Sequence, residues 1–270
     1  MANRNNKNTV TTSPDQAVVA VASPDQAVAN LYESMPDFLR DKVGSARGQE
    51  NVGADDLVIP RLEVVQDLSP CRKRNEPTYI EGAQEGMLYN NVTRELYGES
   101  VLVIPVGFVK EWLIWKDRNK GGGFRGAFPS LEAAEDALAN LVDSDGRPES
   151  EDCAIVDTNQ QFCLLVKPDG SAEEIVVSMA KSKAKVSRKW NSLIRLGNGD
   201  SFSRVYRLSA VEDVNNKNQK FYNFSVAAAG FPAESLYRRA EKMYEAISKG
   251  GVVAHRGEEE PAAGTADSGY

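Results

Sequence analysis

Histidine is almost absent from this sequence: His255 is the single one among 270 residues. Histidine is the commonest side chain in general acid–base catalysis, and it activates most serine and cysteine nucleophiles near neutral pH. His255 also lies beyond the last segment with helical or strand periodicity. The sequence therefore favours a binding protein over an enzyme, and we expect no catalytic residues.

Cysteine is scarce as well. Cys71, Cys153 and Cys163 are far apart and form no CxxC pair, so their spacing matches neither a zinc site nor a disulfide framework. The acids of residues 143–146 lack the spacing of an EF-hand loop, and no GxxxxGK[ST] motif is present. We expect no metal and no cofactor.

Long apolar runs are missing too. No stretch approaches the roughly 18 apolar residues that a membrane helix needs, and the polar start MANRNNKNTV lacks the apolar region of a signal peptide. We therefore expect no membrane association and a location in the cytoplasm.

Charge is unevenly distributed along the chain. The net charge of −7 opposes binding to nucleic acid, whose phosphates require Lys and Arg. Residues 179–210, however, hold eight bases and one acid, for a net charge of +7, whereas residues 131–157 have a net charge of −8. Such segregation is typical of a protein that contacts nucleic acid with one surface.

Composition divides the chain into three parts. Residues 1–53 are rich in Asn, Thr and Ser and contain SPDQAV twice, which predicts a flexible arm; Ser23 and Pro24 favour the start of a short helix there. Residues 54–250 carry the periodic segments of a folded domain. Residues 251–270 are acidic and aperiodic, which predicts a disordered tail.

The periodicity of residues 54–250 predicts an α+β fold. Several short strands, then a helix, then two more strands is the element order of an OB-like antiparallel β-barrel. Extra hairpins, flanking helices and disordered termini account for the remaining length. The expected strands are 57–66, interrupted by Pro60, a hairpin over 86–98, 101–116 with a bend near Pro105 or Gly107, 153–157, 162–166, 175–179, 204–211 and 221–226, and the expected helices are 130–142, 183–196 and 233–249.

Three segments combine cations with aromatic rings, as sequence-tolerant binding of single strands requires. The alternative for each ring is a place in the core, and the glycine-rich loop 119–126 is equally compatible with an ordinary hairpin tip. The candidate nucleic-acid-binding residues are Lys110, Trp112, Trp115, Lys116, Arg118, Lys120, Phe124 and Arg125 in the first segment, Lys181, Lys183, Lys185, Arg188, Lys189 and Trp190 in the second, and Arg204, Tyr206, Arg207 and Tyr222 in the third.

Several blocks of residues 54–250 together resemble a known family. The blocks IPRLEVVQDLSP, GAQEGMLYNNVTRELYG, VLVIPVGFVKEWLIW, SRKWNSLI, RVYRL and FYNF, in this order, are similar to a group of tailed-bacteriophage early proteins thought to bind single-stranded DNA. The resemblance implies an OB-like fold, a role in phage replication or recombination, and no enzymatic step.

The expected function is thus sequence-tolerant binding of single-stranded DNA in phage replication or recombination. The acidic tail provides a means to recruit phage or host replication proteins, or simply a means to stay soluble. Two alternatives stay open: an annealing recombinase or nuclease-associated protein, and a phage regulatory protein that binds a host protein through its acidic segments. The sequence sets no oligomeric state.

Overall fold

The computed structural model describes residues 18–21, 29–32, 47, 58–215, 218–248 and 253–254. The chain divides into two compact units, Met1–Val52 and Gly53–Tyr270. In the first unit, β1 (Val18–Val21) and β2 (Ala29–Tyr32) form an antiparallel hairpin. The helix expected after Ser23 is therefore wrong at residues 29–32, where pairing with the β-branched run VVAV satisfies the backbone instead.

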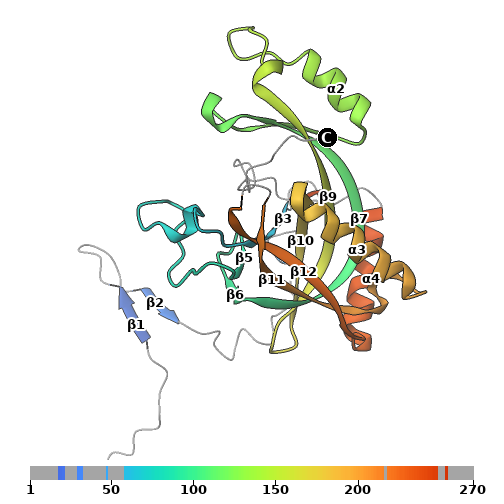
Figure 1. The fold of residues 1–270 in the computed structure, drawn as a ribbon. Coiled ribbons are helices and arrows are strands. Elements are labelled where there is room, and N and C mark those ends of the chain that lie inside the picture. Colours follow the sequence, from blue (N-terminus) through green and yellow to red (C-terminus); the bar gives the residue numbers. More distant parts are fainter. Residues whose placement is uncertain are drawn as a thin grey trace, which may run out of the picture. The chain divides into compact units, whose positions relative to one another are not determined.

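The second unit is mixed α+β, as expected, and its strands are mostly antiparallel (Figure 1). Its strands are β3 (Val58–Ile59), β4 (Leu62–Val64), β5 (Leu88–Asn90), β6 (Leu96–Gly98), β7 (Ser100–Lys116), β8 (Phe124–Phe128), β9 (Cys153–Val166), β10 (Ala172–Ala180), β11 (Val205–Val214), β12 (Lys220–Gly230) and β13 (Val253–Ala254). Its α-helices are α2 (Leu131–Ala139), α3 (Ala184–Leu196) and α4 (Glu234–Ser248).

A six-stranded sheet organises this unit. Its path is β10-β9-β7-β11-β12, and β8 pairs with β7 outside that path. The order β11-β7-β9-β10 is a Greek key, because the chain returns from β10 through α3 to place β11 beside β7. The described strands form an open sheet without a closed barrel, so the OB-like barrel is not confirmed, although α3 does precede the last two strands.

The open side of the sheet is bridged by the chain segment around β4. Val176 on β10 donates its backbone N–H to Pro60 O at 2.8 Å. The Gln66 side chain donates to Tyr222 O at 2.7 Å and accepts from Tyr222 N at 2.8 Å on β12. The expected strand 57–66 is thus divided at Pro60 into β3 and β4, and β4 continues into the small sheet β4-β5-β6.

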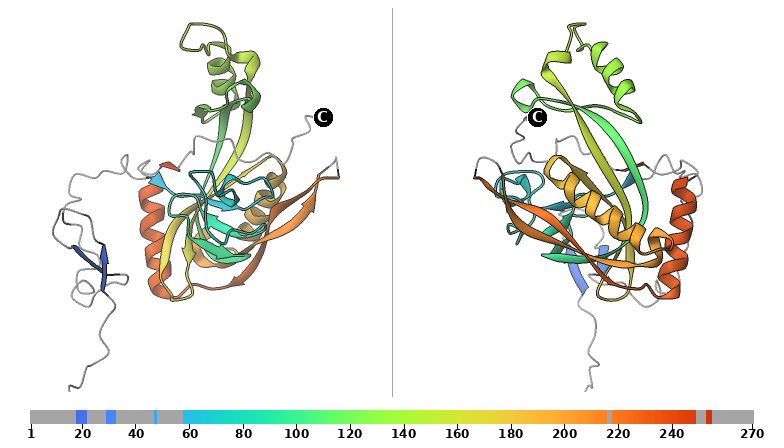
Figure 2. Two further views of the ribbon diagram at one scale, coloured as in Figure 1. Left: turned by 90° about the vertical axis from the view of Figure 1, so that its left-hand side faces the viewer. Right: turned by 45° about the vertical axis from the view of Figure 1, so that its right-hand side comes forward.

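Both faces of the main sheet are buried. One core contains Val103, Leu165 and Leu208, and it is covered by α3 and by residues of β4 and β5. The other core contains alternate residues such as Ile104 and Leu164, and it is covered by α4. Figure 2 shows α3 and α4 as separate helices on this sheet. The strands β7, β9 and β10 therefore read as nearly continuous apolar runs.

The long ladder between β7 and β9 extends beyond this body. Its far end, with β8 and α2, forms what we call the lobe, residues 112–157 (Figure 1). Ser130 caps α2, as its position in the sequence predicts, and accepts a hydrogen bond from Ala133 N at 3.1 Å. The glycine-rich loop ends at Gly123, since Phe124 already belongs to β8.

Most predicted elements are confirmed, the strand β8 was not predicted, and two further differences concern β9 and the tail. The strands expected at 153–157 and 162–166 are one strand, β9, because the polar residues between them, Thr158–Gln161, are buried in the ladder instead of leaving it. Residues 253–254, expected in the tail, form β13, which pairs in parallel with β3. The rest of the tail lies outside the described residues.

Trp190 on α3 provides a test of the packing between helix and sheet. Its ring has 0% exposure, and its centroid lies 6.0 Å from that of Tyr206 in an edge-on arrangement. We expect Trp190→Ala to lower the free energy of unfolding by about 3–5 kcal/mol, because it leaves a cavity in the core. Chemical denaturation measures the change. Leu196→Ala, at a position 80% exposed on the same helix, is the control and should cost no more than about 0.5 kcal/mol; equal losses would contradict the packing described here.

Candidate nucleic-acid interface

The amphipathic helix α3 separates its apolar residues from its bases. Val186 and Trp190 are buried against the sheet, and Gly197 follows the last helical residue. Lys185, Arg188, Lys189 and Arg195 are exposed on the other side, and the helix contains no acid. The spacing that buries one face therefore also concentrates the positive charge on the other.

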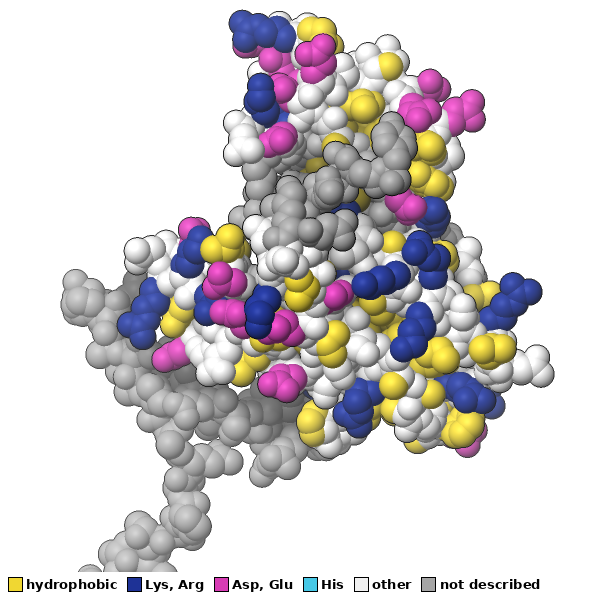
Figure 3. Space-filling view, viewed as in Figure 1, with side chains coloured by type: hydrophobic (Ala, Val, Ile, Leu, Met, Phe, Trp, Pro, Cys, Tyr) yellow, Lys and Arg dark blue, Asp and Glu magenta, His cyan; other side chains and the backbone are white. Residues whose placement is uncertain are grey.

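The cations of α3 differ in their partners. Lys185 pairs with Asp213 at 3.4 Å. Arg188, Lys189 and Arg195 form no ion pair with an acid of the described part of the chain. In Figure 3, Lys and Arg side chains gather over the region of α3, whereas acidic side chains gather in the region of α2. Three of the four exposed cations of α3 can therefore bind phosphate groups without first breaking an ion pair with an acid of the described residues.

Three of the expected stacking rings are in the core, which corrects the sequence prediction. Trp190 and Tyr206 lie in the core under α3, and Trp115 packs in the lobe with its centroid 5.3 Å from that of Phe124. All three residues are buried, with exposures of 2% or less. A base could reach these rings only if the core opened, so they belong to the fold and not to a binding surface.

The remaining residues near α3 are placed in different ways. Lys183 lies over the Phe224 ring at 4.9 Å, and burial lowers the pKa of its ammonium. Arg204 lies over the exposed ring of Phe231 at 5.2 Å. Arg207 is exposed and Lys181 is exposed, whereas Tyr222 is half-buried and contacts the segment around Gln66. Of this group only Lys181 thus extends the open basic surface. Arg207 alternates on β11 with Tyr206 and Leu208 of the core under α3, so it points to the other face of the sheet, which corrects its place in the sequence prediction.

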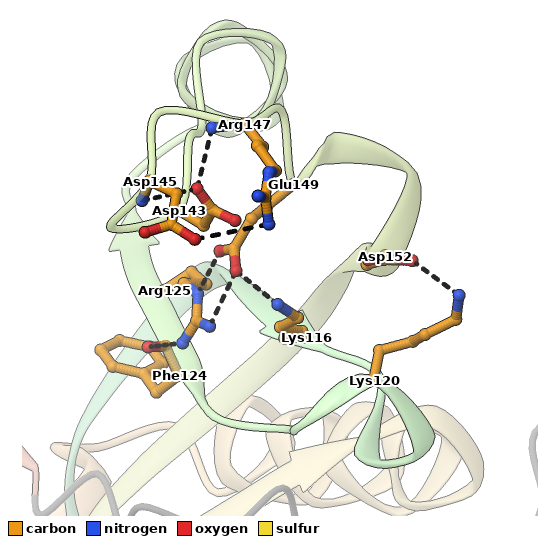
Figure 4. Close-up of polar contacts among 9 residues, drawn as sticks. All are labelled: Lys116, Lys120, Phe124, Arg125, Asp143, Asp145, Arg147, Glu149 and Asp152. Atoms are coloured by element: carbon orange, nitrogen blue, oxygen red, sulfur yellow. Dashed lines mark hydrogen bonds and ion pairs between the residues drawn. The ribbon is translucent and has the colours of Figure 1, made fainter.

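The lobe cations are largely engaged by acids. Figure 4 shows the buried carboxylate of Glu149 held between Arg125 and Lys116, with Arg125 Nε at 2.7 Å. Lys120 pairs with Asp152 at 3.4 Å, and the side chain of Arg118 lies outside the described residues. The ion pairs of the lobe cations therefore connect the loop before β9 to β7 and β8, so these cations have a structural role.

The pKa values of this clasp, Lys116, Arg125 and Glu149, reflect the same contacts. Hydrogen bonds from Arg125 and Lys116 lower the pKa of Glu149 to about 2. The hydrogen bond to Glu149 raises the pKa of both Lys116 and Arg125. Because Glu149 has a lower pKa in the folded than in the unfolded chain, its stabilising contribution is complete above the ordinary pKa of a glutamate and is lost as the pH falls towards 2.

We expect Glu149→Gln to loosen the loop between α2 and β9, because both cations lose their carboxylate. Backbone amides near Pro148 should then be less protected from exchange at neutral pH. Lowering the pH from about 5 towards 2 should reduce their protection factors, which correct for the slower chemical exchange in acid, in the unmodified protein but less in the variant. Hydrogen exchange read by mass spectrometry checks this. Glu151→Gln, at an exposed position nearby, is the control. Equal exchange in both variants would show that the clasp does not hold the loop.

Sequence reasoning missed one exposed aromatic residue in the middle of β7. Phe108 is 45% exposed, and Trp112, also on β7, is half-buried with Lys110 over its ring at 5.0 Å. Lys110 also pairs with Asp157 at 3.0 Å. The signal in the sequence was the strand itself, but which face Phe108 takes depends on a bulge near Val106 that no residue pattern fixes.

Cys71, Cys153 and Cys163 are free thiols, and burial raises the pKa of each. Among the described residues, no three His, Cys, Asp or Glu side chains gather in a way that could hold a metal ion. None of the helices in the described ranges combines the length and apolarity needed to cross a membrane.

Comparison with known proteins adds a family. A family model described as Pam3 phage gp34-like protein matches residues 25–253. No curated protein and no solved structure matches the chain. The expected phage origin is thus confirmed at the level of the family, which carries no statement about DNA binding. Because the match spans most of the sequence, the chain belongs to the family of Pam3 phage gp34-like proteins.

Proposed function

We propose that the protein binds single-stranded DNA without sequence preference through the exposed side of α3, in phage DNA replication or recombination within the host cytoplasm. The observation that carries the proposal is the acid-free row of exposed bases on α3 in a protein whose net charge is −7. Phosphate neutralisation by Lys and Arg is the main source of affinity in sequence-independent binding. The proposal includes no enzymatic step, because this surface needs none.

The charge arrangement on α3 does not serve the stability of the helix. Lys181, Lys183 and Lys185 lie at its N-terminal end, and no acid is present in its first turn. Cations at this end oppose the helix dipole and cost about 0.3–1 kcal/mol each where they are exposed. Cations that weaken the start of their own helix are better explained by a ligand with negative charge than by the fold.

The element order also supports a nucleic-acid-binding fold. The main sheet has a Greek-key order with α3 before its last two strands, which is compatible with a partly open OB-like fold. The gap between β10 and β12 is occupied by the segment around β4 instead of direct strand pairing. On this proposal the partners are single-stranded DNA and, through the acidic residues after 254, phage or host replication proteins.

The salt dependence of binding tests the proposal. If the α3 surface neutralises about four to six phosphates, the logarithm of affinity for an oligo-dT should fall with the logarithm of salt concentration at a slope of roughly −3 to −4. The double variant Arg188→Gln with Arg195→Gln should reduce this slope by about 1.4, since each lost phosphate contact removes about 0.7. Fluorescence anisotropy with labelled oligonucleotides measures both slopes.

A matched control is available on the opposite face of the sheet. Arg239→Gln with Lys242→Gln removes the same charge from exposed positions of α4 and should leave the slope nearly unchanged. Equal effects of the two double variants would mean that net charge, and not the α3 surface, determines binding. Absence of binding by the unmodified protein at low salt would overturn the proposed function and favour a protein partner.

A further inference from the structure

We propose that Phe108 and Trp112, with Lys110 between them, form the strip on which the bases of the bound strand stack. We call these three residues the β7 strip. This inference rests on the proposed function and adds to it the place where the bases, as opposed to the phosphates, are held. Its occupant is a single strand, because only unpaired bases expose faces that can stack on a protein ring.

Strand register places the β7 strip on the same sheet face as α3. In the ladder, Phe108 lies opposite Gln161, and Gln161 donates a side-chain hydrogen bond to Asn191 Oδ1 on α3. Residues directly opposite each other in an antiparallel pair point to the same face. Phe108 therefore faces α3, and Lys110 and Trp112 follow on that face because side chains alternate along a strand.

A bulge in β7 produces this arrangement. The register with β9 shifts between Pro105 and Gly107, so Val106 is an extra residue. Before the bulge, even-numbered Ile104 faces the core under α4; after it, Gly107 contacts Ile247 of α4 and even-numbered Phe108 has changed face. Without the extra residue, Phe108 would point to the α4 side, so the bulge aims the ring at the α3 surface.

Helical spacing determines which Lys and Arg side chains of α3 lie nearest to the β7 strip. Arg188 lies three residues before Asn191 and Arg195 lies four residues after it, so all three share one side of the helix. Since Asn191 contacts β9 beside Phe108, that side of α3 borders the β7 strip. If Arg188 and Arg195 bind phosphates of the strand, the nucleobases attached to those phosphates would thus lie next to Phe108.

The side chains of the strip have the chemistry that stacking requires. Phe108 offers an open ring, and its neighbours two positions along the strand follow at intervals of about 7 Å. Lys110 Nζ lies 5.0 Å from the centre of the Trp112 ring, so a cation is present where a phosphate would pass. Phe128 on β8 lies opposite Trp112, so its side chain is on the same face of the sheet.

Replacement of the rings tests the inference. Phe108→Ala and Trp112→Ala should each weaken binding of an oligo-dT by about 5- to 150-fold, which corresponds to the usual contribution of one stacked base. Neither should change affinity for an abasic oligomer of equal length, which has phosphates but no bases. Phe231→Ala, at an exposed ring elsewhere, is the control and should change neither affinity. Unfolding midpoints identify any variant that has lost its fold, and Phe108→Leu then replaces Phe108→Ala.

The outcomes separate this inference from the proposed function. If the unmodified protein binds oligo-dT with the expected salt slope but Phe108→Ala and Trp112→Ala bind as it does, the strip is wrong and the α3 surface remains. Equal affinity of the unmodified protein for oligo-dT and the abasic oligomer would also overturn the strip. If the unmodified protein binds neither oligomer at low salt, the proposed function itself fails.

Asp157 provides a test in the opposite direction. Its carboxylate pairs with Lys110 at 3.0 Å and would repel a phosphate at the strip. We expect Asp157→Asn to tighten oligo-dT binding several-fold at low salt, because it frees Lys110 and removes a negative charge from the path. Asp145→Asn removes the same charge from an exposed loop of the lobe and is the control. Equal gains from both variants would contradict a path across the strip.

Discussion

The pairing of β7 with β9 is the interaction on which the rest of the second unit depends. β7 pairs with β9 from Leu102 to Lys116, while its other edge pairs first with β11 and, at the far end, with β8. The ladder of these two strands thus connects the body to the lobe. The bulge near Val106 sets the face of the sheet on which each later side chain of β7 lies.

Cations in this protein are divided between structural and available ones. Lys116 and Arg125 hold the buried carboxylate of Glu149, so moving either to a phosphate would leave a buried charge with one partner fewer. By contrast, Arg188, Lys189 and Arg195 form no ion pair with an acid of the described residues. The cation-rich segment 110–125 therefore contributes little open basic surface, whereas the basic segment 179–210 provides exposed cations on α3.

Local patterns were sufficient for most elements, since strands, helix caps and turns depend on neighbours in sequence. The helical spacing of Val186 and Trp190 predicted α3, and Ser130 predicted the start of α2. The continuity of β9 was missed because Thr158–Gln161 look like a loop, yet tertiary hydrogen bonds such as that from Ser178 to Gln160 satisfy them inside the ladder. The sequence likewise does not predict whether each aromatic ring is exposed, because exposure depends on which face of the sheet a helix covers.

The bulge explains why the sequence predicted the cations of the candidate site but not the face of the sheet on which its aromatic rings lie. Strict alternation along residues 101–116 would assign Phe108 to the same face as Ile104, where α4 lies. One extra residue reverses this assignment for everything beyond it, so Trp112 and Lys110 come to the α3 side and Leu113 and Trp115 to the other. The basic helix α3 and the rings of β7 then share one face although they lie far apart in the sequence. Their proximity follows from the contact between Gln161 and Asn191. On the proposed function, the bulge would therefore place rings that select unpaired nucleobases beside a basic surface that attracts any polyanion.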